Sequence, residues 1–252
     1  MYPVLFKLGP LTIYTYGFFV LLGVIITYWL SLKETAWQGI DKNSFSNLFF
    51  WTIIFSFVGA RFLYIVVEWR IFVEYPLRVV LGRSGFVFYG GVIGGLLALY
   101  VLVKKYNLKF LKVADILALY IPLGHAIGRI GCFCYGCCYG RPTDSWIGIQ
   151  FPPHSPAGIL GTKVIPTQLI SLFFLLIIFF ILLNIKRRKK FNGQIFLSYL
   201  VIYGIFRFII EFFRGDPRGY IWIFSTSQWI SIIVVVLSVY YWLRSRKTLH
   251  RE

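Results

Sequence analysis

Charged side chains are scarce in this chain of 252 residues, of which only 14% are Asp, Glu, Lys or Arg. A soluble domain usually has about 25% charged and about 45–50% apolar residues. This chain is 58% hydrophobic and 20% aromatic, and its mean hydropathy is +0.75. These values exclude a disordered chain, a coiled coil and an ordinary cytosolic enzyme. The composition therefore predicts an integral membrane protein.

Acidic residues are especially few, because nine Asp and Glu stand against 26 Lys and Arg, for a formal net charge of +17. Such an excess of positive charge is typical of nucleic-acid-binding proteins. Here, however, most of the basic residues lie in short runs beside apolar segments. In that position they set membrane topology and contact anionic head groups. We therefore expect anionic membrane lipids as their partners, and no nucleic acid.

Seven apolar segments are long enough, or nearly so, to cross a bilayer core, which needs about 20 residues per helix. All are predicted to be helices, because an open strand would leave its backbone groups unpaired in lipid. The sequence thus predicts an all-α integral membrane protein with a single domain over residues 1–252. The predicted spans are residues 16–32, 45–67, 89–103, 113–130, 166–185, 193–213 and 227–243.

The basic residues are distributed unequally between the two sides of these spans. Fifteen lie in the loops and tail on the side of the C-terminus, and eight lie on the side of the N-terminus. The positive-inside rule therefore predicts a cytoplasmic C-terminus and an external N-terminus. No charged segment followed by an A-x-A-like site begins the chain, so no cleavable signal peptide is expected. The longest loop, residues 131–165, lies on the external side, and loops of this length are often functional.

Three arginines lie inside predicted spans: Arg61, Arg129 and Arg207. A charge at that depth costs at least about 2.5–3.5 kcal/mol and is a functional-site hypothesis by default. Glu211 follows Arg207 by four residues on the same helix face, so mutual neutralisation explains this pair equally well. Carboxylates at two span ends are alternative partners for the other arginines. An unpaired guanidinium in a membrane favours the phosphate of a phospholipid.

Glycines form two clusters, at residues 90–95 and 124–140. The first is explained by close helix packing through small residues. The second continues past its span into a segment predicted to be irregular. Non-helical backbone at membrane depth is tolerated only where it is buried in protein or lines a cavity. The irregular segment that follows this span is therefore the candidate wall of a site.

All four cysteines lie in this second segment, at Cys132, Cys134, Cys137 and Cys138. The spacing C-x-C-x2-C-C matches no regular zinc motif, and a second C-x-x-C arm is absent. We therefore predict no metal site and no cofactor. Disulfides in an external loop, small packing residues, a metal cluster and a catalytic thiol remain the alternative interpretations.

The segment GRIGCFCYGCCYGR, at residues 128–141, resembles the signature loop of the prolipoprotein diacylglyceryl transferase family. Five further segments of the chain also resemble family motifs, and they occur in the order found in that family. They are TYG at 15–17, GARFLY around Arg61, FYGGVIGG at 88–95, PTQL at 166–169 and YGIFRFIIEFFR at 203–214. The resemblance covers nearly the whole chain. It implies a multi-pass protein of the bacterial cytoplasmic (inner) membrane.

The family transfers a diacylglyceryl group from phosphatidylglycerol to the lipobox cysteine thiol of a preprolipoprotein, and glycerol 1-phosphate leaves. The resemblance therefore implies a transferase of lipoprotein biosynthesis that uses phosphatidylglycerol and preprolipoprotein signal peptides. It implies that Arg129 binds phosphatidylglycerol and that Arg207 is the second essential arginine. It further implies that Glu211 and Tyr203 are companions of Arg207. Arg61 and Tyr16 correspond to cavity residues of the family, and Gly140 corresponds to a glycine of the signature loop.

The chain departs from the family at several acid–base positions. Tyr89 stands where the family often has histidine, and Cys132 and Cys137 replace an asparagine and a glutamate. The phenol hydroxyl of Tyr89 is better suited to donate a hydrogen bond to phosphate than to act as a base. His125 lies four residues before Arg129 on the same helix face and is the candidate for a relocated base. A buried packing residue is the alternative for His125.

Two other functions remain open at this point. The first is a membrane thiol-redox or metal-binding protein that uses the cluster from Cys132 to Cys138. The second is a lipid-binding paralogue without transfer activity. Substitution of the arginines and of the cysteines separates these alternatives from the transferase.

Overall fold

The computed structural model describes residues 4–9, 11–82, 85–216 and 219–249. Seven helices within these residues are long and apolar enough to cross a membrane, and each overlaps a predicted span. The prediction of an all-α, multi-pass membrane protein is therefore confirmed. Three basic residues that entered the charge comparison, Arg83, Arg218 and Arg251, lie outside the described residues.

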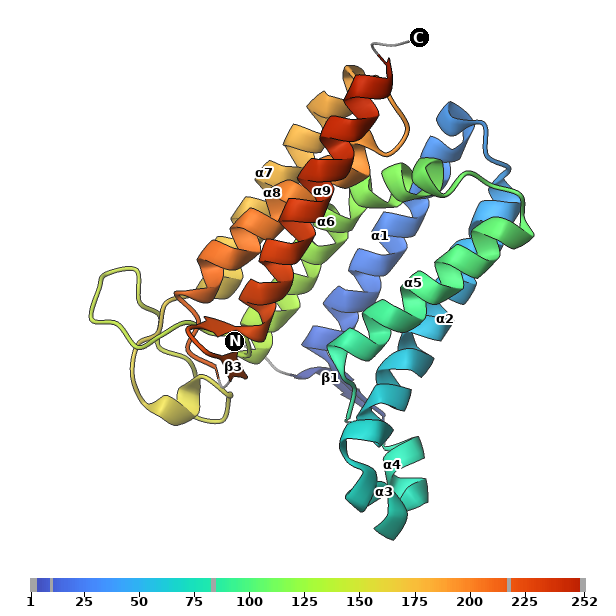
Figure 1. The fold of residues 1–252 in the computed structure, drawn as a ribbon. Coiled ribbons are helices and arrows are strands. Elements are labelled where there is room, and N and C mark those ends of the chain that lie inside the picture. The colour runs from blue at the N-terminus through green and yellow to red at the C-terminus, as the bar shows by residue number, and fades with distance from the viewer. Residues whose placement is uncertain (1–3, 10, 83–84, 217–218, 250–252) are drawn as a thin grey trace. The chain divides into compact units, whose positions relative to one another are not determined.

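The chain divides into two compact units, which we describe one at a time (Figure 1). The first contains Met1–Ser31 and Ala114–Glu252, and the second contains Leu32–Val113. Helix α1 (Thr15–Gln38) begins in the first unit, and α6 (Phe110–Tyr135) begins in the second.

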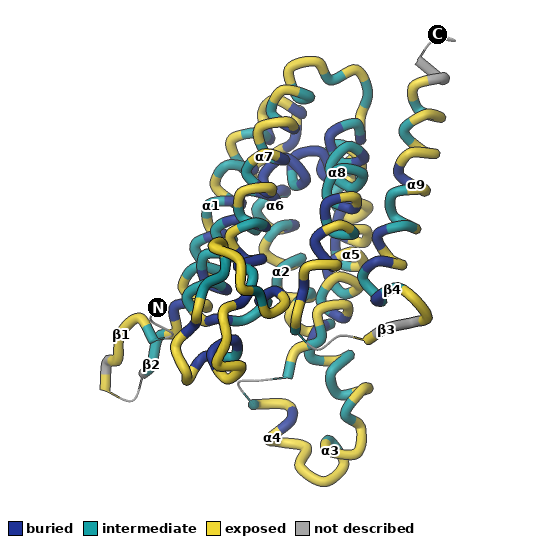
Figure 2. Tube along the Cα trace, turned by 90° about the vertical axis from the view of Figure 1, so that its left-hand side faces the viewer, coloured by how far each residue is buried: buried dark blue, intermediate teal, exposed yellow. Residues whose placement is uncertain are grey.

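In the first unit, α8 (Gln194–Glu211) packs against α7 (Thr167–Arg187) and against α9 (Thr226–Leu249). Buried apolar side chains of α6, α7 and α8 form a common core. In the most apolar 18-residue stretch of α6, 56% of the residues are buried, a larger share than in any other candidate span of the described chain. Figure 2 shows exposed residues along many helices as well as in loops, because the outer apolar faces of a membrane protein contact lipid. Helix α6 is therefore the central element of this unit.

Asp115, in the second turn of α6, is fully buried. Its carboxylate accepts hydrogen bonds from the backbone N–H groups of Gly193 (2.7 Å) and Phe196 (2.9 Å), at the start of α8. It also forms an ion pair of 2.9 Å with Lys189 Nζ. A carboxylate at a helix N-terminus satisfies free N–H groups and interacts favourably with the helix dipole. Asp115 therefore fastens α6 to α8 and is not the carboxylate partner of a span arginine.

Helices α1 and α6 approach closely at two glycines of the first unit. A Cβ atom added to Gly124 would lie 2.8 Å from the backbone oxygen of Gly23, a separation that real Cβ atoms essentially never show. Beside this contact, the Thr27 hydroxyl donates a weak hydrogen bond of 3.5 Å to the backbone oxygen of Tyr120. Gly128, one turn further along α6, has open space where its Cβ would lie.

These two glycines allow a matched test of packing. We expect Gly124→Ala to lower the free energy of unfolding by about 1–3 kcal/mol, because the backbone of α1 has to move to admit the methyl group. Gly128→Ala is expected to leave stability unchanged or to raise it by less than about 1 kcal/mol. Thermal unfolding of both variants in the same detergent measures the difference. Equal midpoints for the two variants would contradict the close contact of α1 and α6.

The second unit is built around α2 (Lys42–Val67) and α5 (Phe88–Lys105), which pack along each other. A Cβ on Gly94 would lie 2.5 Å from the backbone oxygen of Phe55 and 3.0 Å from the Cα atom of Gly59. The first glycine cluster therefore serves close helix packing, as predicted. Two short helices, α3 (Trp69–Glu74) and α4 (Pro76–Leu81), lie between α2 and α5 in sequence.

The predicted start of the external loop is wrong. The external loop was expected to begin at Gly131, but α6 continues to Tyr135. The helix ends before Gly136, whose φ of +79° turns the chain so that the next N–H, of Cys137, donates to the backbone oxygen of Cys132 (3.2 Å). Glycine is the residue that most readily adopts this left-handed conformation after a helix. Cys132 and Cys134 therefore lie on a helix, and the loop contains only Cys137 and Cys138.

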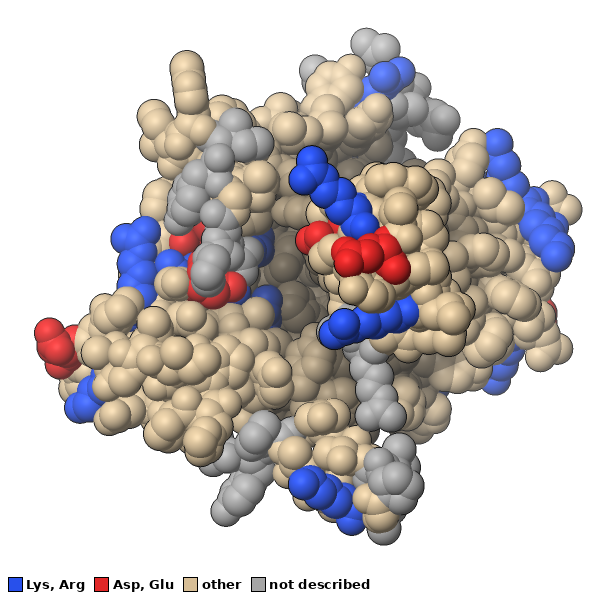
Figure 3. Space-filling view, turned by 90° about the horizontal axis from the view of Figure 1, so that it is seen from below, with Lys and Arg blue, Asp and Glu red and all other residues tan. Residues whose placement is uncertain are grey.

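Small elements outside the spans were not predicted. Strands β1 (Val4–Leu8) and β2 (Leu11–Tyr14) form an antiparallel hairpin before α1. Strands β3 (Tyr220–Ile221) and β4 (Phe224–Ser225) form a second one between α8 and α9. The loop after α6 contains a short 3-10 helix, η1 (Gly158–Leu160). Figure 3 shows the molecule from below the view of Figure 1. Acidic and basic side chains occur together on this face, among residues of other kinds.

Candidate functional site

Arg129 lies on α6, two turns before its C-terminal end, and is partly buried. Its Nε atom is buried and has no hydrogen-bond partner among the described residues. The described part of the chain also provides no carboxylate in an ion pair with this guanidinium. A buried donor of this kind is costly unless it gains a partner. The Arg129 guanidinium is therefore available to bind an anion.

Arg207 and Glu211 form the ion pair that their spacing allows. Arg207 Nη1 lies 2.7 Å from Glu211 Oε2, and the two side chains are 15% and 3% exposed. Arg207 Nη2 also donates a hydrogen bond of 3.2 Å to the hydroxyl of Ser227, at the start of α9. The pair thus neutralises two charges on α8 and links this helix to α9. Neutralisation, which the sequence left open, is what the structure shows for these two residues.

His125 is close enough to both Arg129 and Arg207 for the charges of both to act on its imidazole. Its ring centroid is 5.8 Å from that of Tyr203 on α8. Tyr203 in turn stacks on Tyr199, with the centroids 5.5 Å apart. The first unit therefore brings together five of the predicted site residues, from α6 and α8: His125, Arg129, Tyr203, Arg207 and Glu211.

Tyr16, in the first turn of α1, belongs to the same neighbourhood. Its hydroxyl interacts electrostatically with Arg129 and with the thiols of the loop after α6. Its ring lies 6.4 Å from the ring of Tyr135, at the end of α6. Gly131 makes this approach possible, because a Cβ there would lie 3.1 Å from the Cα atom of Tyr16. Tyr16 thus lies in the neighbourhood of Arg129, while its substrate-binding role stays a prediction.

Gly140 lies where three segments of the chain meet. Its N–H donates to the backbone oxygen of Ile165 (2.9 Å), and the next N–H, of Arg141, donates to that of Phe213 (2.9 Å). A Cβ on Gly140 would lie within 2.8 Å of both oxygens. Gly140 is therefore needed for backbone packing of the loop, and its predicted contact with substrate stays a prediction.

Two residues that the sequence analysis did not select hold the cysteine-containing loop in place. The Thr167 hydroxyl donates to the backbone oxygen of Cys138 (2.7 Å), and Gln168 Nε2 donates to that of Cys137 (2.8 Å). Both side chains are fully buried at the start of α7. The signal in the sequence was the polar pair inside PTQL, at the beginning of an otherwise apolar span.

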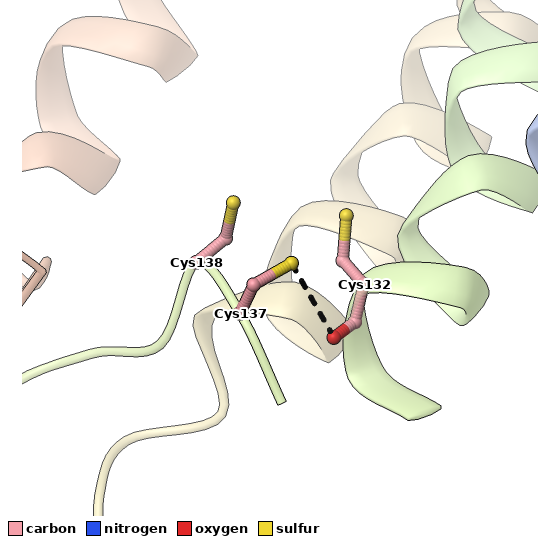
Figure 4. A group of neighbouring side chains, drawn as sticks. All are labelled: Cys132, Cys137 and Cys138. Atoms are coloured by element: carbon pink, nitrogen blue, oxygen red, sulfur yellow. Dashed lines mark hydrogen bonds between the residues drawn. The ribbon is translucent and has the colours of Figure 1, made fainter. Parts of the chain in front are cut away.

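Three of the four cysteines form a cluster. The Sγ atoms of Cys132, Cys137 and Cys138 all lie within 4.8 Å of one another. Figure 4 shows the three side chains at the end of α6 and in the following loop, with the contact of 3.9 Å between Cys137 Sγ and the backbone oxygen of Cys132. All four cysteines are free thiols in this structure. Cys134 is not a member of the cluster.

The cluster has a cationic neighbour that the sequence analysis missed. The Arg214 side chain is 3% exposed and binds both carboxylate oxygens of Asp216, at 2.8 and 2.7 Å. Hydrogen bonds with the thiols of Cys132 and Cys137 hold the pKa of the Cys138 thiol below its usual range, and the charge of Arg214 acts in the same direction. Hydrogen bonds with Cys132 and Cys138 raise the pKa of Cys137. Negative charge in the cluster therefore gathers on Cys138.

Arg61 and Tyr89 belong to the second unit. The Arg61 guanidinium donates to the backbone oxygens of Gly85 (2.8 Å) and Gly82 (2.7 Å), and it lies 5.1 Å from the ring centroid of Phe86. These contacts fasten the segment that precedes α5. Tyr89 is the second residue of that helix and is 38% exposed. The expected roles of these two residues toward substrate stay predictions.

Comparison with known proteins connects this geometry to a family. The model of the family described as prolipoprotein diacylglyceryl transferase matches residues 3–244. The chain belongs to this family. Among its relatives is the phosphatidylglycerol–prolipoprotein diacylglyceryl transferase of Clostridium tetani, which is 38% identical over 240 residues, or 95% of this chain and 96% of that protein.

Two further relatives agree with this assignment. The protein of Clostridium perfringens named phosphatidylglycerol–prolipoprotein diacylglyceryl transferase 2 is 38% identical over 92% of this chain and 91% of its own length. The phosphatidylglycerol–prolipoprotein diacylglyceryl transferase of Finegoldia magna is 36% identical over 97% and 96%, respectively. The resemblance that the motifs indicated is thereby confirmed over nearly the whole chain.

The first unit thus gives this member of the prolipoprotein diacylglyceryl transferase family a defined set of chemical groups. It has a guanidinium suited to an anion, a neutral Arg–Glu pair, an imidazole near both arginines and a cluster of three thiols. Such a set can bind a phosphate, accept a proton and interact with a sulfur nucleophile.

Proposed function

We propose that the protein transfers the diacylglyceryl group of phosphatidylglycerol to the lipobox cysteine thiol of a preprolipoprotein signal peptide, with release of glycerol 1-phosphate. The observation that supports this most is Arg129, a partly buried arginine for which the described residues supply no carboxylate. Family membership supplies the context, since the relatives named above are phosphatidylglycerol–prolipoprotein diacylglyceryl transferases.

The reaction is a displacement at a glyceryl carbon. The sulfur of the acceptor cysteine forms a bond to this carbon, the bond from the carbon to the phosphate oxygen breaks, and its electron pair stays on the phosphate. The proton of the thiol is lost before or during the attack. Donors aimed at the oxygen on which charge develops stabilise such a transition state. We assign this role to Arg129, whose planar fork fits two phosphate oxygens.

We assign Arg207, Glu211, Tyr203, Tyr16 and Gly140 of the first unit to the wall of the donor site. For Arg61, the family motif around it supports a substrate-binding role. The Arg207–Glu211 pair is neutral as a unit, so it orients a phosphate less strongly than an unpaired arginine does. Tyr89 is proposed to donate a hydrogen bond to the phosphate.

His125 is the candidate that takes the thiol proton. We expect His125→Gln to lower the transfer rate by about 10²-fold, because general bases contribute at least this much to many reactions. The KM for phosphatidylglycerol is expected to stay within about twofold, since the Arg129 guanidinium remains in place. Steady-state kinetics over a range of pH measures both effects. His154→Gln, at an exposed histidine of the external loop, is the matched control, and equal rates for the two variants would remove His125 from the mechanism.

We propose the bacterial cytoplasmic membrane as the location, with the N-terminus and the loop after α6 outside. This orientation rests on the count of basic residues, fifteen on the C-terminal side against eight on the other. It places the cysteine cluster at the external surface. A signal peptide that crosses the membrane presents its lipobox cysteine near that surface.

The direct test uses the purified protein in vesicles with a synthetic lipobox peptide. We expect the peptide to gain the mass of one diacylglyceryl group when the vesicles contain phosphatidylglycerol. The same peptide with serine in place of cysteine should remain unmodified, as should the cysteine peptide in vesicles of phosphatidylcholine alone. Binding of phosphatidylglycerol by a folded protein that never modifies the peptide would instead identify a lipid-binding paralogue.

A further inference from the structure

The three-thiol cluster has the dimensions of a metal site. Zinc binds thiolate sulfur at about 2.3 Å in a tetrahedral arrangement, which places the sulfur atoms about 3.8 Å from one another. The Sγ atoms of Cys132, Cys137 and Cys138 already lie within 4.8 Å of one another. The observed separations therefore exceed those that a zinc ion requires by about 1 Å at most.

The backbone of the cluster is held in this arrangement by other parts of the first unit. Thr167 and Gln168 bind the backbone oxygens of Cys138 and Cys137, and Gly136 turns the chain back onto α6. Cys138 itself has a φ of +61°, a conformation that residues other than glycine adopt only rarely. The sulfur atoms thus come from fixed backbone positions on two elements. A preformed arrangement of this kind lowers the cost of ordering ligands when an ion binds.

The charges around the cluster favour a bound divalent cation with three thiolates. Three thiolates and one divalent cation carry a net charge of −1. Arg129 interacts electrostatically with Cys132, and Arg214 interacts with Cys138. The Arg129 guanidinium compensates this net negative charge, whereas the charge of Arg214 is largely balanced by its ion pair with Asp216. No fourth His, Cys, Asp or Glu side chain of the described chain belongs to the cluster.

We propose that Cys132, Cys137 and Cys138 bind a thiophilic divalent cation such as Zn²⁺, and that its fourth position takes the thiol of the incoming acceptor peptide. Three protein ligands with one open position are typical of catalytic zinc sites, whereas structural sites have four protein ligands. The second half of this inference rests on the proposed function, because it needs a thiol substrate.

The chemistry is consistent with the transfer reaction. A thiol that coordinates such a cation loses its proton, which passes to water or to His125. The coordinated sulfur keeps an electron pair with which it attacks the glyceryl carbon, while the carbon–oxygen bond to the phosphate breaks. The product is a neutral thioether, which is a weaker ligand than a thiolate and is therefore released. Tyr16, which interacts with both Arg129 and the cluster, shows that the phosphate-binding candidate and the thiols share one neighbourhood.

Metal content tests the first half of the proposal. The full-length protein is purified under reductant, incubated with Zn²⁺, freed of unbound metal and analysed by elemental mass spectrometry. We expect about one zinc per chain in the wild type and in Cys134→Ser, the matched control outside the cluster. Cys137→Ser and Cys138→Ser are expected to lose at least about 90% of it. No bound zinc in the wild type, equal retention in all variants, or a disulfide within the cluster under these conditions would overturn the proposal.

Cobalt substitution tests the second half. The Co²⁺-loaded protein is expected to show sulfur-to-cobalt charge-transfer absorption that increases on addition of the cysteine lipobox peptide, and not on addition of the serine peptide. Unchanged absorption with both peptides would overturn the acceptor-binding role. Zinc removal by a chelator is expected to lower peptide modification by at least tenfold, and readdition of zinc to restore it. Full transfer activity without zinc would overturn this role and leave the proposed function intact, whereas zinc binding without any transfer would remove the function and the acceptor-binding role together.

Discussion

Arg129→Ala is expected to lower the rate of diacylglyceryl transfer by about 10³-fold. Removing one preorganised donor from a developing negative charge typically costs about 10²–10³-fold in rate, and the guanidinium of Arg129 offers two donors to one phosphate. The described residues contain no ion pair that would otherwise occupy this side chain. The effect is therefore expected in catalysis and donor binding, with little change in stability. Initial rates of peptide modification and thermal unfolding of the same preparation measure the two quantities separately.

Two further variants make this result specific. Arg129→Lys keeps the positive charge but loses the planar fork, so its rate is expected to fall between those of the wild type and Arg129→Ala. Arg141→Ala removes an exposed arginine of the loop that follows α6 and is expected to change the rate by less than about twofold. If Arg129→Ala retained more than a tenth of the wild-type rate, the assignment of Arg129 to the phosphate would be wrong.

Glu211→Gln is expected to lower the free energy of unfolding by about 3–5 kcal/mol. Removal of one member of a buried ion pair leaves the other charge uncompensated, and the Glu211 and Arg207 side chains are 3% and 15% exposed. Chemical unfolding in detergent, followed by tryptophan fluorescence, measures this loss. Asp144→Asn, at an exposed carboxylate of the external loop, is the matched control and is expected to change stability by less than about 0.5 kcal/mol.

A double variant separates the structural part of this effect from the catalytic part. Arg207→Met combined with Glu211→Leu replaces the buried pair by apolar side chains, an exchange that is often neutral or stabilising. We expect it to recover most of the stability that Glu211→Gln loses. The transfer activity of the double variant is expected to be well below that of the wild type if Arg207 contacts the donor lipid. It is expected to be close to that of the wild type if the pair only links α8 to α9. A loss of stability in the double variant as large as in Glu211→Gln would contradict the account of the pair.

The membrane spans were predictable because the bilayer imposes one simple requirement, a long apolar run for each helix. All seven predicted spans overlap observed helices, from α1 (Thr15–Gln38) to α9 (Thr226–Leu249). The end of α6 was predicted five residues too early, because Gly131 was interpreted as a break. Within a helix that packs against others, glycine instead admits a neighbour, which here is Tyr16. The true end of α6 is marked by Gly136, with its positive φ.

The site was only partly predictable. The spacing of Arg207 and Glu211 indicated their ion pair, since residues four apart share a helix face. The contacts of Thr167 and Gln168 with the cysteine loop join positions 29 and 31 residues apart, and no local pattern reveals such contacts. The packing of Arg214 beside Cys138 is equally non-local. The cysteine spacing matched no known metal motif, because the cluster combines the last turn of a helix with the loop that follows it.

The central claim is most directly tested by the stoichiometry of the reaction. Purified wild-type protein is incubated with phosphatidylglycerol vesicles and a lipobox peptide, with and without reductant, and both products are quantified in the same sample. We predict one glycerol 1-phosphate released for each peptide that gains a diacylglyceryl group, with neither product formed by Arg129→Ala on the same timescale. A folded protein that forms neither product under either redox condition, or that releases glycerol 1-phosphate without modifying the peptide, would contradict the account.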